Sequence, residues 1–269
     1  MQIKSVLKEA YKKRQPWSRK GNFGKLLVVG GSKTYTGAPS IVGLAAMKSG
    51  CDLVYIEAPQ RAADVSASFS PNLITCPLKG DFLTNKHFKE IQKISSDAVV
   101  FGNGLGEKSG GLCKLMWKIK KPCVIDGDAL KCLPPKLGKN FVLTPHAGEF
   151  SIITGRKTPV NLESRKTLVK EYAKRLNCTI LLKGHVDIIS DGSDVSLNKT
   201  GNPYMTKGGT GDVLAGICGA ILARGIQPYK AACAAAYISG AAGDLAVKKY
   251  GESLLATDVI EEIKNVINR

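Results

Sequence analysis

The feature that most constrains the fold is a regular alternation between short apolar segments typical of β-strands and longer segments with helical periodicity. From Lys25 onward it runs KLLVVGG, PSIVGLAAMKSG, DLVYIEAP, NLITCPL, KHFKEIQKIS, DAVVFGN, GLCKLMWKIK and PCVIDGDAL. The strand-like members are apolar almost throughout, which indicates strands buried on both faces. This order is typical of β-α-β units, so we predict a three-layer α/β/α fold with a mainly parallel central sheet.

The second half of the chain continues with strands and ends in helices. We expect a strand, a turn and a helix start in NFVLTPHAGEF, a long amphipathic helix in LESRKTLVKEYAKRLN, and short strands in TILLKG, VDIISDG and VSLNKTG. The last two strands are expected to form a hairpin around Asp191 and Gly192. Three helices follow, in GDVLAGICGAILARG, YKAACAAAYISGAAGDLAVKKYG and LATDVIEEIKNVINR. No repeat or linker interrupts the pattern, so residues 1–269 are expected to form a single domain.

The composition favours a globular enzyme over a nucleic-acid-binding or membrane protein. A chain of 269 residues, 43% of them hydrophobic, can bury a large core, and no apolar run reaches transmembrane length. The formal net charge of +17 favours anionic partners, but the lysines are scattered and only YKKRQPWSRK is dense. Because no recognition motif has a defined spacing, we expect neither nucleic acid nor a membrane as a partner.

The eight cysteines stand apart, without a C-x-x-C pair or a nearby histidine cluster, and most lie in or beside apolar runs. We therefore expect small core residues kept reduced in the cytoplasm, rather than a zinc or redox site. The start of the chain, MQIKSVLKEAYKKR, has no apolar core, so we predict neither a secretory signal nor a membrane anchor.

Polar and glycine-rich clusters follow several of the predicted strands. They are GGSKTYTGAPS, GNGLGEKSGG, DGDAL, TPHAGE and KGHVD. In open α/β sheets, ligands bind at the carboxyl ends of the strands. We therefore expect these loops to line one crevice.

One further stretch, NKTGNPYMTKGGTGDVLAG from Asn198 to Gly216, places a carboxylate where a glycine-rich loop becomes a helix. The apolar residues after Asp212 recur at helical spacing. They predict a buried helix that begins near Gly211 and ends by Gly225.

The glycines before this helix suggest an anion site. Gly208, Gly209 and Gly211 carry no Cβ, so a phosphate could approach the unpaired N–H groups of the first helical turn. The alternative is that Thr210 or Asp212 simply caps the helix. We favour the anion site, because one cap does not require the whole glycine cluster.

The turn FGNGLGEKSG, from Phe101 to Gly110, is similar to two phosphate-binding loops and matches neither. Gly102, Gly104 and Gly106 lack the spacing of a dinucleotide fingerprint, and Glu107 stands where a P-loop has its second glycine. Either this turn lets a ligand approach the backbone closely, or it is an ordinary glycine turn.

Two residues of TPHAGEF are candidates for the crevice. His146 follows a strand and a proline, and both ligand contact and a structural role are open for it. Glu149 could support a ligand-binding group, but we favour a role as the acid that starts a helix. His87 and His185 have no comparable context and are expected at the surface.

Three charged residues follow other strands of the crevice. Asp126 and Asp128 in DGDAL could hold magnesium through water, or serve in capping and turn formation, which is the commoner use. Lys183 ends a buried strand next to a glycine, where its ammonium group could meet a phosphate or pair with an acid.

The chain resembles a known family in the order of GGSKTYTGAPSIVGLAAMKSGCDLV, FGNGLG, VIDGDAL, LTPHAGEF, LLKG and NKTGNPYMTKGGTGDVLAG. The family is the ADP/ATP-dependent NAD(P)H-hydrate dehydratases of the ribokinase-like superfamily. The resemblance runs from about Gly24 to beyond Ala246, and TGNP with GGTGDVLAG and TPHAGE is its most specific part. It implies a ribokinase-like fold in a cytoplasmic protein, and a homo-oligomer for which a tetramer is one form.

The resemblance also implies an activity in nicotinamide nucleotide repair. The S-epimer of hydrated NADH or NADPH would be dehydrated, driven by cleavage of ADP or ATP, with Mg²⁺ accompanying the phosphates and no protein metal ligand implied. The ring hydroxyl would accept a phosphoryl group, and the phosphate would then leave by elimination. ADP and ATP present the same adenine, so the sequence does not choose between them.

Roles for individual residues come from the same resemblance. Asp212 would be the catalytic base. The hydrate site would be lined by Ala38, Gly104, His146 and Asp212. The adenine nucleotide would be bound by Lys183, Gly184, His185, Val186, Asp187, Gly208, Gly209, Thr210 and Gly211.

Three positions depart from the pattern of the family. Asn103 stands in place of a usual proline, Gly127 of an alanine and Tyr204 of a glycine. None removes a group with a chemical role, and Tyr204 could crowd the site or stack on a base. The epimerase domain often fused to this family has no room here, so the chain is expected to stand alone.

Two other functions remain open. A ribokinase-like kinase of a small-molecule alcohol, such as a vitamin precursor, would use the same glycine loop and aspartate. A basic nucleotide- or nucleic-acid-binding protein on an inactive kinase fold would bind in a salt-sensitive way without needing Asp212.

Overall fold

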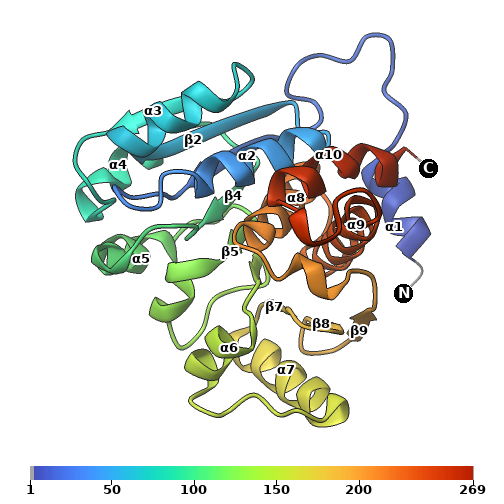
Figure 1. Cartoon of the computed structure of the whole chain (residues 1–269). Helices are drawn as coiled ribbons and strands as arrows, with labels where there is room; N and C mark the ends of the chain where they lie inside the picture. Colours follow the sequence, from blue (N-terminus) through green and yellow to red (C-terminus); the bar gives the residue numbers. More distant parts are fainter. Residues whose placement is uncertain (1–2, 269) are drawn as a thin grey trace.

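The computed structural model describes residues 3–268, in which nine strands form one sheet in the order β3-β2-β1-β4-β5-β6-β7-β8-β9 (Figure 1). The strands are β1 Lys25–Val29, β2 Leu53–Pro59, β3 Ile74–Leu78, β4 Ala98–Phe101, β5 Cys123–Ile125, β6 Phe141–Leu143, β7 Thr179–Leu182, β8 Asp187–Ser190 and β9 Val195–Asn198. Strands β1 to β7 pair in parallel, whereas β8 and β9 add antiparallel pairs. The mainly parallel sheet and the β8–β9 hairpin are therefore confirmed.

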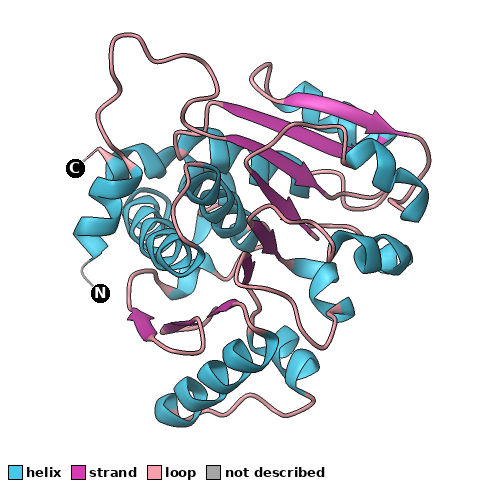
Figure 2. Cartoon of the chain, turned by 180° about the vertical axis from the view of Figure 1, so that it is seen from behind, coloured by secondary structure: helices cyan, strands magenta, loops and turns pink. Residues whose placement is uncertain are grey.

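Helices cover both faces of the sheet (Figure 2). They are α1 Ile3–Ala10, α2 Ala38–Lys48, α3 Gln60–Phe69, α4 Phe88–Ile91, α5 Gly110–Met116, α6 Ala147–Thr154, α7 Leu162–Leu176, α8 Thr210–Ala223, α9 Pro228–Tyr250 and α10 Ala256–Ile267. Along β1, Leu26 and Val28 join the core under α2, α8, α9 and α10, while Leu27 and Val29 join the core under α5, α6 and α7. Both faces of the strand are buried, as its continuous apolar sequence predicts.

Close packing explains the small residues of α8. Every residue from Val213 to Ala223 is buried. A Cβ on Gly216 would lie 2.3 Å from the carbonyl oxygen of Val42 in α2, so this glycine lets the two helices touch. Most alanines of α9 are also buried in the core of the chain, where they serve as packing residues.

Other parts of the chain differ from the sequence analysis or extend it. The segment Ile3–Ala10 forms α1, which the sequence analysis did not identify, and KHFKEIQKIS contains only the short helix α4. All eight cysteines are free, and six of them are buried, as expected for core residues. Within residues 3–268, no helix has both the length and the apolar character that a membrane crossing requires.

Strand β2 buries an ionisable group. The Glu57 side chain is only 2% exposed, and its Oε2 has no hydrogen-bond partner among residues 3–268. Burial, with a smaller contribution from Glu90, raises the pKa of Glu57 from 4.5 to about 7. The fold therefore favours the protonated form, and the stability this adds is lost as the pH rises through about 7.

Replacing Glu57 with glutamine should therefore stabilise the protein in a pH-dependent way. The pKa shift corresponds to about 3 kcal/mol, so Glu57→Gln should raise the free energy of unfolding by about that amount near pH 8 and by little near pH 4. Urea unfolding of both proteins at the two pH values measures the difference. Glu163→Gln, at a side chain 75% exposed, is the control and should have no such effect. An equal gain at both pH values would contradict the assignment.

Candidate active site

Four polar side chains meet at the carboxyl ends of the strands on the β4–β7 side of the sheet. Asn103 follows β4, Asp126 follows β5, Lys183 follows β7, and Asp212 lies in the first turn of α8. The Nδ2 group of Asn103 donates to Asp212 Oδ1 at 2.6 Å and to Asp126 Oδ2 at 2.9 Å. Lys183 Nζ lies 3.0 Å from Asp126 Oδ1. The predicted crevice is thus a hydrogen-bonded cluster, which we call the acid–amide cluster.

The start of α8 leaves Asp212 free of a capping role. The helix begins at Thr210 and ends at Ala223, close to the predicted limits, and its N-cap is Gly209 with φ +94° and no side-chain cap. The Thr210 hydroxyl donates to the carbonyl oxygens of Met205 and Lys207 instead. The alternative of a plain side-chain cap is therefore wrong, and the N–H groups of the first turn remain available to an anion.

The surroundings of Asp212 make it a base suited to neutral pH. Burial raises the pKa of this carboxyl to about 6, the hydrogen bond from Asn103 opposes the rise, Asp126 adds to it and Lys183 opposes it. Above about pH 6 the group is mainly ionised, yet it remains basic enough to take a proton from a hydroxyl group. Among residues 3–268, Asn103 is the one hydrogen-bond partner of this carboxylate, which leaves Oδ2 unengaged.

Lys183 stays charged in this cluster. Burial alone would lower its pKa, but Asp126, Glu149 and Asp212 outweigh burial and raise it. The sequence left open whether Lys183 meets a phosphate or pairs with an acid, and in the structure it forms an ion pair with Asp126. A Cβ on Gly211 would lie 3.3 Å from Lys183 Nζ, so the ammonium group also sits against the first turn of α8. A negatively charged ligand at that turn would meet both the ammonium group and the N-terminal end of α8.

Asp126 and Asp128 are occupied by protein donors. Asp126 accepts hydrogen bonds from Asn103, from the Thr144 hydroxyl at 2.7 Å and from Lys183. Asp128 accepts from the Gly106 backbone at 2.8 Å and pairs with Lys131. Neither caps the turn that follows, and among residues 3–268 no group of three or more His, Cys, Asp or Glu side chains could hold a metal. A magnesium ion fits here only when phosphate oxygens and water supply its ligands.

The glycine turn after β4 approaches other backbone closely. Gly104 has φ +68°, and an added Cβ would lie 2.8 Å from Tyr35 Cβ and 3.1 Å from Ala38 Cβ. The structure therefore brings Ala38 and Gly104 together and adds Tyr35, which is 57% exposed, whereas their place in a hydrate site stays a prediction. Tyr204 is 41% exposed on the surface turn Pro203–Met205, so it does not fill the interior of the site.

His146 and Glu149 form the start of α6. The Nδ1 atom of His146 accepts from the backbone N–H groups of Gly148 and Glu149, and Glu149 Oε2 accepts from the His146 backbone at 2.9 Å. The helix-start role of Glu149 is confirmed. The His146 side chain is 61% exposed and donates to no member of the acid–amide cluster, so its contact with substrate stays a prediction.

The segment from Lys183 to Asp187 forms a tight turn between β7 and β8. Asp187 accepts from the Gly184 backbone at 3.0 Å and from Asn198 at 2.9 Å, and a Cβ on Gly184 would lie 2.7 Å from Arg165 in α7. His185 is exposed, as expected, and Val186 is half-buried at the tip. Sequence analysis missed Arg165 and Asn198, since no local spacing joins them to the turn.

Gly208 and Gly209 complete the predicted nucleotide-binding residues. A Cβ on Gly208 would meet no atom within 4 Å, so this position is open, whereas one on Gly209 would lie 2.8 Å from Ile41. The loop before them is held by Asp244, which accepts from the Gly201 backbone at 3.0 Å and from Asn202 at 3.1 Å. The loop is therefore shaped before any ligand binds.

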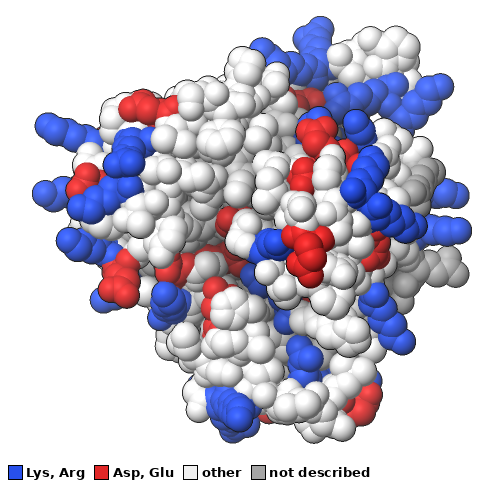
Figure 3. Space-filling model, viewed as in Figure 1, with Lys and Arg blue, Asp and Glu red and all other residues white. Residues whose placement is uncertain are grey.

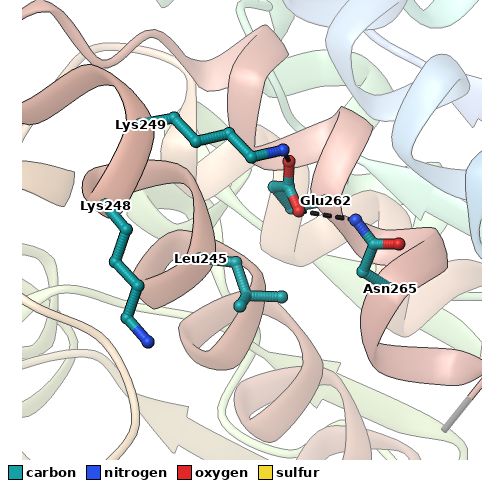
Figure 4. A pocket seen from close by; sticks show the side chains of 5 residues that line it. All are labelled: Leu245, Lys248, Lys249, Glu262 and Asn265. Carbon is teal, nitrogen blue, oxygen red and sulfur yellow. Dashed lines mark hydrogen bonds and ion pairs between the residues drawn. The ribbon is translucent and has the colours of Figure 1, made fainter.

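Among residues 3–268, cavities also lie outside the acid–amide cluster. One, of about 340 Å³, is a surface depression between α9 and α10 lined by Leu245, Lys248, Lys249, Glu262 and Asn265 (Figure 4). There Glu262 pairs with Lys249 at 2.5 Å and accepts from Asn265 at 2.7 Å, so its polar groups satisfy one another. Another, of about 260 Å³, adjoins Gly106 and Asp128 beside the glycine turn.

The surface charge agrees with the scattered lysines of the sequence. On the face seen in Figure 3, basic side chains gather at the upper right and at the left edge, others lie near the middle, and acidic groups lie among them.

Comparison with known proteins identifies the family of the chain. The family model described as NAD(P)H-hydrate dehydratase matches residues 26–265. The chain is 42% identical to a bifunctional NAD(P)H-hydrate repair enzyme of Pyrobaculum aerophilum over 95% of its own length, but it spans only 53% of that relative. It is 40% identical to an ADP-dependent (S)-NAD(P)H-hydrate dehydratase of Cenarchaeum symbiosum, covering 93% of this chain and 90% of the relative.

The fold comparison points the same way. The structure matches the ADP/ATP-dependent NAD(P)H-hydrate dehydratase of Bacillus subtilis, co-crystallised with ATP/Mg²⁺, with a TM-score of 0.86 and 29% identity, covering 99% of this chain and 96% of that one. With this match the ribokinase-like α/β expectation is confirmed. The chain belongs to the NAD(P)H-hydrate dehydratase family.

Proposed function

We propose that this protein is an ADP-dependent dehydratase that restores NADH and NADPH from their S-epimer hydrates. The observation that carries the proposal is the placement of Asp212. Its carboxylate lies at the positive end of α8, with one oxygen held by Asn103, the other unengaged and the charged Lys183 nearby. A base beside an anion site is what transfer of a phosphoryl group to a hydroxyl requires.

The first step joins the two substrates. Asp212 Oδ2 accepts the proton of the ring hydroxyl, whose oxygen attacks the terminal phosphorus of ADP while the bond to the AMP oxygen breaks. The N–H groups of the first turn of α8, freed by Gly209 and Gly211, and the ammonium group of Lys183 stabilise the charge on the transferring group. With ATP, the leaving group is ADP instead.

The second step eliminates the phosphate. The carbon–oxygen bond of the phosphate ester breaks as the ring loses a proton, which yields inorganic phosphate and the double bond of reduced nicotinamide. Phosphate is a far better leaving group than hydroxide, so the cleavage of ADP drives the dehydration. When Mg²⁺ is bound with the nucleotide, it neutralises phosphate charge.

The substrates occupy the two sides of the acid–amide cluster in this account. Ala38, Gly104 and His146 line the hydrate side. The nucleotide side comprises the turn from Lys183 to Asp187 and the residues 208–211. Support for the second assignment is the contact between Lys183 and the start of α8, which joins both segments at one point.

The identity of the products tests this proposal. With hydrated NADH, Mg²⁺ and ADP, phosphorus NMR should show AMP and inorganic phosphate in equal amounts. A phosphate ester that persists would instead identify a kinase of a small-molecule alcohol, and salt-sensitive binding of RNA or DNA without turnover would favour the non-enzymatic alternative.

We further propose that residues 1–269 act as one cytoplasmic catalytic domain. A single sheet through the described residues supports the single domain, and eight free thiols are typical of a reducing compartment. The homo-oligomer, with a tetramer as one form, stays a prediction that light scattering of the purified protein would test.

A further inference from the structure

We propose that Asn103 is the positioning residue of the active site, which fixes the Asp212 carboxylate and keeps its free oxygen directed at the reacting hydroxyl group. This inference rests on the role of Asp212 as base in the proposed function. It begins from an amide placed between two carboxylates, where one nitrogen donates both of its hydrogens: one to Asp212 at 2.6 Å and one to Asp126 at 2.9 Å.

The position of Asn103 is itself fixed. The residue is 2% exposed, and its backbone carbonyl oxygen accepts a hydrogen bond from the Gly31 N–H group at 2.8 Å. A Cβ on Gly30 would lie 2.5 Å from the same carbonyl oxygen, so the end of β1 packs directly on this residue. Asn103 therefore behaves as part of the sheet rather than as part of a mobile loop.

The second contact of the amide is fixed as well. Asp126 is held by the Thr144 hydroxyl at 2.7 Å and by Lys183 at 3.0 Å. Because the Asn103 amide is hydrogen-bonded both to this fixed carboxylate and to Asp212, it also restrains the first turn of α8. Fixed geometry of this kind matters, since a misplacement of about 1 Å can cost on the order of 10²-fold in rate.

The hydrogen bonds to Asp212 and Asp126 decide the orientation of the Asn103 amide, as its side-chain oxygen shows. The Oδ1 atom of Asn103 is buried and has no hydrogen-bond partner among residues 3–268. Leaving a buried acceptor unpaired costs about 1–3 kcal/mol. Turning the amide over would not help, because Oδ1 would then face two carboxylate oxygens. The observed orientation therefore leaves Oδ1 without a hydrogen bond, and it provides a donor to each of the two carboxylates.

A neutral donor also suits the chemistry of a base. The charged and polar groups that face Asp212 are Asn103, Asp126 and Lys183, from the ends of β4, β5 and β7. Asp126 favours protonation of Asp212, and the amide hydrogen bond favours its ionised form. Loss of the amide should therefore move the pKa of Asp212 upward, away from its value of about 6.

The test is a titration of Asp212 in variants of Asn103. The carboxyl carbon of Asp212, identified by its absence from the Asp212→Asn spectrum, is followed by NMR against pH in the full chain. In Asn103→Leu, which keeps the branched shape without the amide, and in Asn103→Ser, which is too short to bridge, the midpoint should rise by about one pH unit. Two variants are used so that the titration can still be carried out on one of them if the other folds poorly.

A matched control separates positioning from general stability. Asn140 also donates two hydrogen bonds from one amide, to the carbonyl oxygens of Ile119 and Lys121. Asn140→Ser should lower the melting temperature without moving the Asp212 midpoint. An Asp212 midpoint that is unchanged or lowered in the folded Asn103 variants would overturn the inference.

Activity gives an independent second readout. The acid limb of the kcat/KM profile for dehydration should move upward with the NMR midpoint, and kcat should fall more than KM rises. The NMR titration does not require turnover. If the native protein shows no dehydration, the proposed function fails while the positioning role of Asn103 can still be decided.

Discussion

Asp212→Asn should lower kcat for dehydration by about 10²–10⁴-fold, the contribution typical of a positioned general base. The amide can still accept the hydrogen bond from Asn103, but it cannot take the proton of the ring hydroxyl group. Binding of nucleotide should change little. Steady-state kinetics for dehydration, with nucleotide affinity measured by calorimetry, would separate the two effects.

The control for this substitution is the acid at the same position of another helix. Asp258 lies in the first turn of α10, as Asp212 does in α8, but it caps its helix by accepting from the Leu255 backbone at 2.8 Å. Asp258→Asn should cost about 1 kcal/mol of stability and leave turnover intact. A loss of activity in both variants, or in neither, would remove the special role of Asp212.

Asp212→Asn should also raise the free energy of unfolding of the protein. Burial raises the pKa of Asp212 from 3.8 to about 6, so the stability of the protonated form is present at low pH and is lost as the pH rises through about 6. Asp212→Asn removes that loss, which corresponds to about 3 kcal/mol near pH 8. Gain of stability with loss of activity is typical of a residue kept for catalysis.

Gly102→Ala should destabilise the fold by more than about 4 kcal/mol, the range reserved for severe steric changes. Gly102 has φ +124°, and an added Cβ would lie 1.9 Å from the carbonyl oxygen of Asp126 and 2.8 Å from Ala129 Cβ. Since the first contact is with backbone, relief requires the turns after β4 and β5 to separate. That movement would also disturb the acid–amide cluster. Urea unfolding measures the loss.

Gly80→Ala is the matched control for this prediction. Gly80 has φ +110°, and an added Cβ would meet no atom within 4 Å. It therefore carries the backbone strain without the clash, and should cost about 1–2 kcal/mol. Equal losses in the two variants would mean that the close approach of Gly102 to Asp126 is not a constraint on the fold.

Much of the architecture could be predicted because it depends on local patterns. Continuous apolar strands alternating with amphipathic segments led to a parallel sheet with helices on both faces, and the helix after Asp212 was placed within about two residues of its limits. The helix α4 was overestimated, because KHFKEIQKIS has helical spacing but only Phe88–Ile91 forms an α-helix.

The candidate site was predictable in part. Lys183 lies against Gly211, so two segments that were expected to bind the nucleotide are side by side in the structure, while their binding role stays a prediction. The contacts of Asn103 with Asp126 and Asp212 could not be foreseen, because they join residues 23 and 109 positions apart and have no sequence periodicity. Sequence analysis treated Asn103 only as a replacement that removes nothing, whereas the structure has its amide bridging two acids.

The most direct test of the account is the return of the near-ultraviolet absorbance of reduced nicotinamide from purified S-epimer hydrate. The native protein is mixed with the hydrate and Mg²⁺, and ADP, ATP or no nucleotide is added. We expect the absorbance to return with ADP and not without a nucleotide, and the arm with ATP tells whether the donor is exclusive. Folded protein that restores no absorbance with either nucleotide would contradict the proposed function.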